Sequence, residues 1–453
     1  MIYQNSQYEN TENMFFNAIK ELQIGKLLRN ANVTKACGIP ALKVFKFLLL
    51  LVFQGKNLFR FLNSKYGEKA SSKNTYYRFL NEPSYNWKKF LLLLSAKVIS
   101  AFDSLTRPDR VKAFVLDDSV VSRNRSSKVE LLADVYDHAN HKFLKGFTML
   151  ALGWTDGYSF IPVGFNMLSS ANENNRYQEA SQKIDHRTNG YKARKEALLQ
   201  KPEAAIKLLQ RALQAGIQAD YVLMDTWFTT EPMICSILKE GLEVIGMVKQ
   251  LKQRYIYRGK EYTLPGLKKF MQHETADTIL GSIIVSTKKE GIPVKIVFVR
   301  NHNKRNECLY LLSTDCGLSE AEIVRIYGNR WSIEVFFKAS KSLFKLETEF
   351  QSRSYDAMVS HTTVVFTRYI LLEWIRRNQN DHRTYGELFY MFCDDIQDMD
   401  LTNALKSLMT LFVEQINAVA SHSINNVISK LQDWIASQAS YIQALFTNLC
   451  WES

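Results

Sequence analysis

The sequence predicts an α/β fold in which a mixed sheet in the middle of the chain is flanked by helical segments. Three observations lead to this class. Apolar residues recur at helical spacing up to about residue 108, short apolar runs separated by turn residues follow, and helical spacing returns after about residue 356. With 453 residues, the chain is long enough for two or three domains with a sizeable core.

The composition is that of an ordinary soluble protein with an excess of positive charge. Hydrophobic residues make up 46% of the chain, charged residues make up 23%, and the formal net charge is +13. This charge favours a polyanionic partner. The longest apolar runs, 47–53 and 90–94, are too short to span a bilayer, so no membrane association is expected. The N-terminus lacks the layout of a signal peptide, and six unpatterned Cys argue against a disulfide framework or a zinc site and favour a reducing cytoplasm.

We expect residues 1–109 to form a helical N-terminal domain. Within it, a polar turn precedes a short basic and aromatic segment, 69–80, that contains Lys73 and Arg78. This segment is either the second helix of a helix-turn-helix, a DNA-binding motif, or part of a small bundle with a solvated basic face.

Strands alternate with helices between residues 110 and 355. The predicted elements are a strand at 111–116, a hairpin at 147–166, a charged helical stretch at 174–215 closed by Gly216, a strand at 220–224, a helix from 231 and a strand at 242–248. This order fits a ribonuclease-H-like mixed sheet. We read residues 249–316 as a β-rich insertion, with strands at 254–257, 279–285, 294–300 and 308–313.

Residues 356–453 are expected to form a helical C-terminal region. Its most apolar part, 359–376, suits burial in a helical bundle or in an interface between two subunits. No chemistry is apparent in the last hundred residues.

One stretch near residue 330 combines a single carboxylate with a row of cations. Ser319 and Glu322 predict a capping box upstream of it. If 326–341 is one continuous helix, four polar residues fall within roughly 60° of one another on one face, with Lys338 close by. These four residues are Tyr327, Arg330, Glu334 and Lys341. The alternative is a surface helix with ordinary ion pairs.

The spacing Tyr-x2-Arg-x3-Glu-x6-Lys resembles the YREK signature of cut-and-paste bacterial transposases, the insertion-sequence four type of the DDE superfamily. The resemblance extends to Trp331, to Ile333 and to the Phe-x-Lys-Ala pattern around Lys338. By motif it covers roughly residues 110–350. It implies a transposase that binds terminal inverted repeats, through the N-terminal region, and cuts and joins double-stranded DNA.

Three carboxylates are expected to hold the catalytic metal ions. Two Mg²⁺ ions supply what phosphodiester cleavage needs, and they are held by few carboxylates, which the fold must bring together. We predict that Asp117, Asp225 and Glu334 are these catalytic and metal-binding residues, with Mn²⁺ able to replace Mg²⁺. The family's first motif, Asp-x-Ser/Thr, favours Asp117, while Asp118 is the alternative. Its second motif, Asp-x-x-Phe, matches Asp225.

The polar residues around Glu334 are expected to contact DNA. Arg and Lys are donors only, so they can hold phosphates beside the metal ions without competing as ligands. The resemblance implies this role for Tyr327, Arg330, Lys338 and Lys341.

Aromatic and histidine residues are less clearly assigned. The resemblance implies that a flipped base stacks on an aromatic side chain, and Tyr255 and Tyr257 are candidates. Trp227 and Trp331 are expected in the core. The Tyr136–His141 segment carries His138 and His141, which are expected to be structural or to face DNA and not to bind metal.

The sequence therefore predicts a DNA transposase that acts on transposon ends and target DNA, as a homodimer on DNA, in association with the bacterial nucleoid. The resemblance implies hydrolysis at the transposon end, a hairpin intermediate and strand transfer. A nuclease of the same fold without strand transfer remains an alternative. So does a domesticated DNA-binding protein with an inactive site, although the complete acidic set argues against it.

Overall fold

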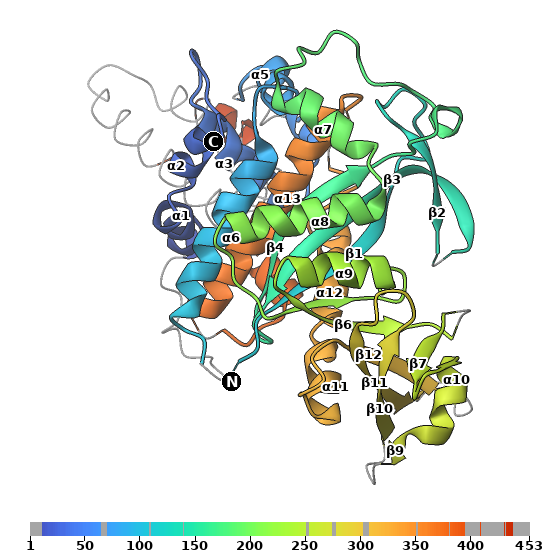
Figure 1. The fold of residues 1–453 in the computed structure, drawn as a ribbon. Coiled ribbons are helices and arrows are strands. Elements are labelled where there is room, and N and C mark those ends of the chain that lie inside the picture. The colour runs from blue at the N-terminus through green and yellow to red at the C-terminus, as the bar shows by residue number, and fades with distance from the viewer. Residues whose placement is uncertain are drawn as a thin grey trace, which may run out of the picture.

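One 12-stranded mixed sheet runs through the molecule, with helices on both of its faces (Figure 1). The computed structural model describes residues 11–64, 70–107, 110–138, 140–250, 253–273, 278–301, 308–349, 352–379, 381–394, 408, 430 and 432–437. Helices α8 and α9 contact strands of the sheet from the side that faces the viewer in Figure 1, and α12 and α13 contact it from behind. The predicted α/β class with a ribonuclease-H-like core and helical flanks is confirmed.

The described residues of the N-terminal part form helices joined by turns, with no strand among them. Helix α6 begins at Asn86, whose side chain accepts a hydrogen bond from the backbone N–H of Lys89. Its buried residues recur every three or four positions, so one face packs on β4 and α13. The helices here are α1 (Thr11–Glu21), α2 (Ile24–Asn30), α3 (Ala41–Leu50), η1 (Leu51–Gln54), α4 (Leu58–Leu62), α5 (Lys73–Leu80) and α6 (Trp87–Asp103).

The core of the sheet is formed by β1, which lies between antiparallel β3 and parallel β5. All four residues of β5 are buried, as expected for a central strand covered on both faces. The turn between β3 and β4 has Gly157 at φ 81°, as the predicted hairpin requires. The strands of this part are β1 (Ala113–Ser122), β2 (Ala133–Asp137), β3 (Lys142–Thr155), β4 (Phe160–Leu168), β5 (Tyr221–Met224) and β6 (Glu243–Val248).

The charged stretch predicted as one helical region at 174–215 consists of a short 3-10 turn, loops and two α-helices, α7 and α8. Thr188 caps the first helix, accepting a hydrogen bond from the N–H of Tyr191, and Pro202 lies in the first turn of the second. Gly216, at φ 80°, follows the second helix as predicted. The helices here are η3 (Glu173–Asn175), α7 (Asn189–Ala197), α8 (Lys201–Gln214) and α9 (Glu231–Lys239).

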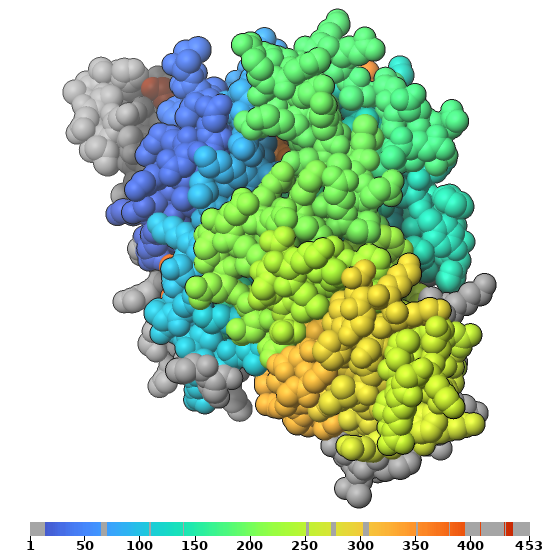
Figure 2. Space-filling view, in the orientation of Figure 1, coloured from blue at the N-terminus to red at the C-terminus, as the bar shows by residue number. Residues whose placement is uncertain are grey.

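The predicted β-rich insertion contains strands at all four expected positions, and it extends the main sheet. Its last strand, β12, pairs with β6 through Tyr310 and Val248. The elements are β7 (Tyr255–Tyr257), β8 (Lys260–Tyr262), α10 (Leu264–Leu267), η4 (Lys268–Phe270), β9 (Gln272–His273), β10 (Ile279–Thr287), β11 (Pro293–Arg300) and β12 (Cys308–Ser313). Figure 1 and Figure 2 show this part in yellow-green to yellow at one end of the molecule, with α7 towards the other end.

The segment predicted as one helix at 326–341 is broken into α11 (Glu320–Gly328) and α12 (Trp331–Ser342). At the break, the N–H groups of Asn329 and Arg330 bond to carbonyls three residues back, which tightens the last turn of α11. The Ser332 hydroxyl also donates to the carbonyl of Asn329. The predicted capping box at Ser319 is present.

Helix α13 (Tyr355–Asn378) is buried along almost its whole length, in contact with α1, α3, α6 and β4. It thus belongs to a helical bundle within this chain. Beyond it, the described residues 385–394 are helical. No described helix combines the length and the apolar character needed to cross a bilayer.

The buried His361 of α13 should make stability depend on pH. Its Nε2 atom is 3.1 Å from the carbonyl oxygen of Leu346, and its Nδ1 atom is 3.6 Å from Glu349. Burial, with the positive charges of Arg368 and Arg123, lowers the pKa of the imidazole to about 3 from 6.5. Between these two pKa values the unfolded chain binds a proton at His361 and the folded protein does not. The free energy of unfolding is therefore highest above pH 6.5, and it falls by up to about 1.4 kcal/mol per pH unit as the pH drops toward the folded pKa.

Chemical unfolding at pH 7 and pH 5 measures this effect. The wild type should lose more stability on acidification than His361→Gln, because the Gln amide does not bind a proton in this pH range. Equal losses in the two proteins would show that His361 does not cause the dependence.

Candidate active site

Strands β1 and β5 bring two aspartates to neighbouring positions. The last paired residues of the two parallel strands are Leu116 and Met224, so Asp117 and Asp225 come next on each. The negative charge of Asp225 acts on Asp117 and raises its pKa. The predicted position of Asp117 at a strand end is wrong, because β1 continues to Ser122 by pairing with β3.

Helix α12 adds the third carboxylate through a bridging arginine. The Arg330 guanidinium donates from Nη1 to Asp117 Oδ2 at 2.9 Å and from Nη2 to Glu334 Oε1 at 2.5 Å. The side chains of Arg330 and Asp117 are each 15% exposed, and that of Glu334 is 37% exposed. One cation therefore holds the strand carboxylate and the helix carboxylate together.

Asp117 is costly to ionise in this position. Burial raises the pKa of its carboxyl to about 7, and the negative charges of Asp225 and Asp118 add to this rise. Arg330 and the hydrogen bond that Asp117 accepts from the Asp118 N–H act in the opposite direction. The carboxyl of Asp225 accepts hydrogen bonds from the N–H groups of Trp227 and Phe228, which fix it at the end of β5. A further cation at this site would stabilise the ionised form of Asp117.

Asp118, the alternative first carboxylate, faces elsewhere. Its Oδ1 accepts from Lys201 Nζ of α8 at 2.9 Å, on the other side of the sheet from α12. Successive residues of a strand point to opposite faces, so Asp117 and Asp118 cannot both face Glu334. The sequence carries no signal for the Lys201 contact, because 83 residues separate the two partners.

The other residues of the signature occupy different surroundings. The Tyr327 ring lies 5.9 Å from the Arg330 guanidinium, and burial raises the pKa of its hydroxyl to about 12. Lys341 Nζ donates to the carbonyl of Val120 at 2.6 Å and so joins α12 to β1. Lys338 is exposed on α12.

The structure does not bring the predicted N-terminal DNA contacts to the carboxylates. Lys73 and Arg78 are exposed on α5, which packs on α3 and α13 through its buried Tyr76, Phe79 and Leu80. Figure 1 shows α5 at the top of the molecule and α12 near its middle.

Two predictions about aromatic residues are wrong. Trp227 and Trp331 were expected in the core, but they are 42% and 62% exposed: Trp227 lies in the turn after β5, and Trp331 is the first residue of α12. Conversely, Tyr255 is fully buried and cannot stack on a base, while Tyr257 is half-buried against Phe270.

The donor set fits a divalent ion only after a rearrangement. Carboxylate oxygens are the ligands that Mg²⁺ and Mn²⁺ prefer, and Asp117, Asp225 and Glu334 supply them. Within the described residues, however, no three His, Cys, Asp or Glu side chains are arranged to hold an ion. The Arg330 guanidinium lies between Asp117 and Glu334. An ion bound by all three carboxylates would require Arg330 to release at least one of them.

Comparisons with known proteins agree with this chemistry. The sequence matches the family model described as DDE superfamily endonuclease over residues 45–260 and the one described as transposase DDE domain over residues 196–371. No curated protein matches it. The first range contains Asp117 and Asp225, and the second contains Asp225 and Glu334. Residues 45–371 are therefore similar to endonucleases and transposases of the DDE superfamily, whose enzymes generally use divalent metal ions.

Proposed function

We propose that this protein is a cut-and-paste DNA transposase of the insertion-sequence four type, with the YREK signature. One observation carries the proposal. Arg330 bridges Asp117 and Glu334, and Asp225 lies on the strand beside Asp117, in a chain that matches DDE families. Residues 1–109 would bind the terminal inverted repeats, 110–355 would carry out catalysis, and 356–453 would contribute to a homodimer on DNA. The protein would work on the nucleoid in the bacterial cytoplasm.

The three carboxylates would hold divalent ions, Mg²⁺ with Mn²⁺ as a substitute, which polarise the phosphodiester and activate water. The chain's own residues prepare this site. Arg330 partly offsets the charges of Asp117 and Glu334 before DNA binds, and a phosphate can then accept from its two N–H donors. Tyr327 lies beside Arg330 and can donate a hydrogen bond to the same phosphate. Lys341 is bonded to β1, so it also keeps α12 in place.

Incubation with the ends of its own element and Mg²⁺ tests the proposal. The ends can be identified as inverted repeats that flank the gene. A gel that separates nicked, hairpin and joined products should show all three. Nicks without joined DNA would favour an endonuclease without strand transfer, the other activity that the family descriptions include. No cleavage of any duplex, with either Mg²⁺ or Mn²⁺, would contradict both.

Removing Arg330 should strengthen metal binding by the protein in the absence of DNA. Without the guanidinium, no cation competes for Asp117 and Glu334, so Arg330→Met should bind Mn²⁺ about tenfold more tightly in the absence of DNA. The electron paramagnetic resonance signal of free Mn²⁺ measures this directly. Lys338→Met, which removes an exposed cation from the same helix, is the control. Weaker Mn²⁺ binding in Arg330→Met would mean that Arg330 only positions the carboxylates.

A further inference from the structure

The β2–β3 hairpin carries exposed aromatic side chains that the proposed chemistry does not use. Phe143 and Tyr136 form a cross-strand pair with ring centres 5.1 Å apart, and they are 70% and 38% exposed. His138 stacks edge-on against Tyr136 at 4.9 Å. Tyr177 is also exposed, and the Lys145 amine lies 4.2 Å from the centre of its ring. We call these four rings, together with Lys145, the aromatic face of the hairpin.

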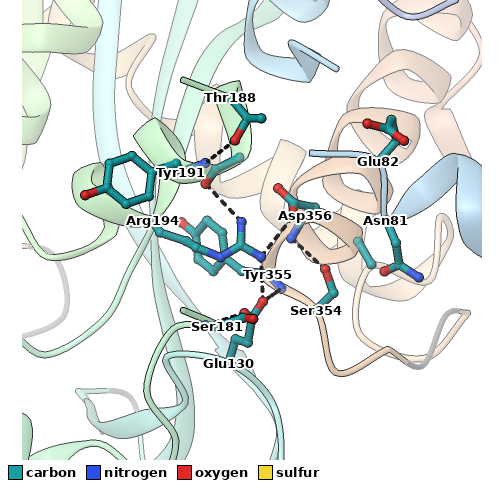
Figure 3. Close-up of polar contacts among 12 residues, drawn as sticks. Asn81, Glu82, Glu130, Ser181, Thr188, Tyr191, Arg194, Ser354, Tyr355 and Asp356 are labelled. Atoms are coloured by element: carbon teal, nitrogen blue, oxygen red, sulfur yellow. Dashed lines mark hydrogen bonds and ion pairs between the residues drawn. The ribbon is translucent and has the colours of Figure 1, made fainter. Parts of the chain in front are cut away.

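A buried ion network lies in the segment just before β2, and Figure 3 shows its residues. Arg194 of α7 bonds to Glu130, just before β2, at 2.5 Å and to Asp356 of α13 at 2.8 Å. Glu130 also accepts from the N–H groups of Tyr355 and Ser181. Because these charged groups are almost fully buried, breaking any pair would leave an uncompensated charge. The hairpin is therefore held firmly relative to the sheet and to α13.

The aromatic face lies on the same side of the sheet as Asp117. Asp117 pairs with Ala151 of β3, and Phe143 is eight positions from Ala151, an even step that keeps both side chains on one face, with no register shift in the β1–β3 or β2–β3 pairing. The contacts of α12 with β1 run in this direction too, because Arg330 contacts Asp117 and Lys341 contacts Val120. The aromatic face and the carboxylates therefore lie on one face of the sheet, and α12 runs from the carboxylates in the direction of the hairpin.

We propose that the aromatic face of the β2–β3 hairpin is a DNA contact, placed at a fixed distance from the catalytic carboxylates. From Ala151 to Phe143 the strand covers about 27 Å at ~3.4 Å per residue. This length corresponds to about eight base pairs at ~3.4 Å per base pair. Exposed aromatic side chains contact bases by stacking or as wedges between base steps. The inference rests on the proposed function, since it needs DNA at the carboxylates.

Charge favours DNA over a protein partner as the occupant. Around the hairpin, Arg125, Lys128 and Lys142 are exposed, and Lys145 lies on the aromatic face itself. Asp134 and Asp137, which accept hydrogen bonds from the neutral groups of Tyr177 and Asn140, supply two negative charges against these four cations. The remaining cations suit a phosphate backbone next to the bases that the rings would contact.

The test compares the full-length wild type with Phe143→Ser in fluorescence anisotropy, using duplexes that extend at least 15 base pairs on both sides of the cleavage position. Phe143→Ser should bind about tenfold more weakly, with an unchanged dependence of affinity on salt, because a ring neutralises no phosphate. Phe143→Trp should restore binding. Lys145→Gln, by contrast, should lower the salt slope by about 0.9, because Lys145 is a cation on the aromatic face. Shortening the duplex to fewer than about eight base pairs on one side should remove the difference between Phe143→Ser and wild type, and the side on which this happens distinguishes element DNA from flanking DNA.

Tyr390→Ser is the matched control, since Tyr390 is an exposed aromatic residue, at 63%, that contacts one ring outside the hairpin. Three results would overturn the inference: equal affinities of Phe143→Ser and Tyr390→Ser, a loss that does not depend on duplex length, or a loss that accompanies a changed oligomeric state in sedimentation. The last would assign the aromatic face to an interface between copies of the chain. If the wild type binds no duplex at all, the proposed function fails together with the inference. Normal binding by both the wild type and Phe143→Ser overturns the hairpin contact alone.

Discussion

Asp117→Asn, Asp225→Asn and Glu334→Gln should each reduce DNA cleavage by at least about a thousandfold while leaving DNA binding largely intact. The physical reason is that each change replaces a charged oxygen ligand with a neutral amide of the same shape, so that the site can no longer hold divalent ions that stabilise the transition state. The fold should survive, because the substituted side chains keep their size and can still accept hydrogen bonds. Single-turnover cleavage of a labelled duplex, with binding measured in parallel, provides both quantities.

Asp118→Asn is the matched control for this set. It alters an aspartate one position along the same strand, but one that pairs with Lys201 on the other side of the sheet. It should therefore retain cleavage within a few-fold of wild type. Loss of cleavage in Asp118→Asn together with full activity in Asp117→Asn would reverse the assignment of the first carboxylate. A Glu334→Gln protein that cuts at the wild-type rate would remove α12 from the active site.

Arg368→Met should lower the free energy of unfolding by about 3–5 kcal/mol, the cost of leaving a buried charge without its partner. Arg368 is fully buried on α13 and bonds to both carboxylate oxygens of Glu349 at 2.7 Å. Its other donors reach the carbonyls of Leu48 and Leu49 at the end of α3 and that of Phe344 after α12. One side chain thus joins the N-terminal helices to the segment that follows Glu334.

Denaturant unfolding followed by circular dichroism measures this loss, with Arg383→Met as the control, because Arg383 pairs with Asp381 near the surface and should contribute under about 1 kcal/mol. Burial raises the pKa of Glu349, and Arg368 opposes the rise. Without Arg368, Glu349 should be protonated in the folded protein, so the destabilisation should grow as the pH rises above 4.5. Addition of Glu349→Gln to Arg368→Met should recover part of the stability at pH 8. Equal effects of the two arginine variants would show that the buried pair does not stabilise the fold.

Local patterns determined the positions of many elements. The capping box at Ser319, the Gly157 turn and the strands of the insertion depend on neighbouring residues, whose side-chain alternation and backbone preferences are visible in the sequence. The same reasoning missed strand β2, which is short and half-exposed, and it missed the break at Asn329, where hydrogen bonds shift by one residue without Pro. Periodicity alone did not distinguish one helix from two.

The sequence by itself predicted which residues carry the chemistry, namely Asp117 with Asp118 as the alternative, Asp225 and Glu334, because the motif spacing and the donor types of the side chains are properties of the chain. Only the tertiary structure decided how they meet. It turned Asp118 toward Lys201 and set Arg330 between two carboxylates. It also placed the aromatic side chains of the β2–β3 hairpin on the same face of the sheet as Asp117. The contacts of Asp118 with Lys201 and of Asp117 with Arg330 join residues that are distant in sequence. Their energies depend on burial and on charges brought near by packing, which no local pattern encodes.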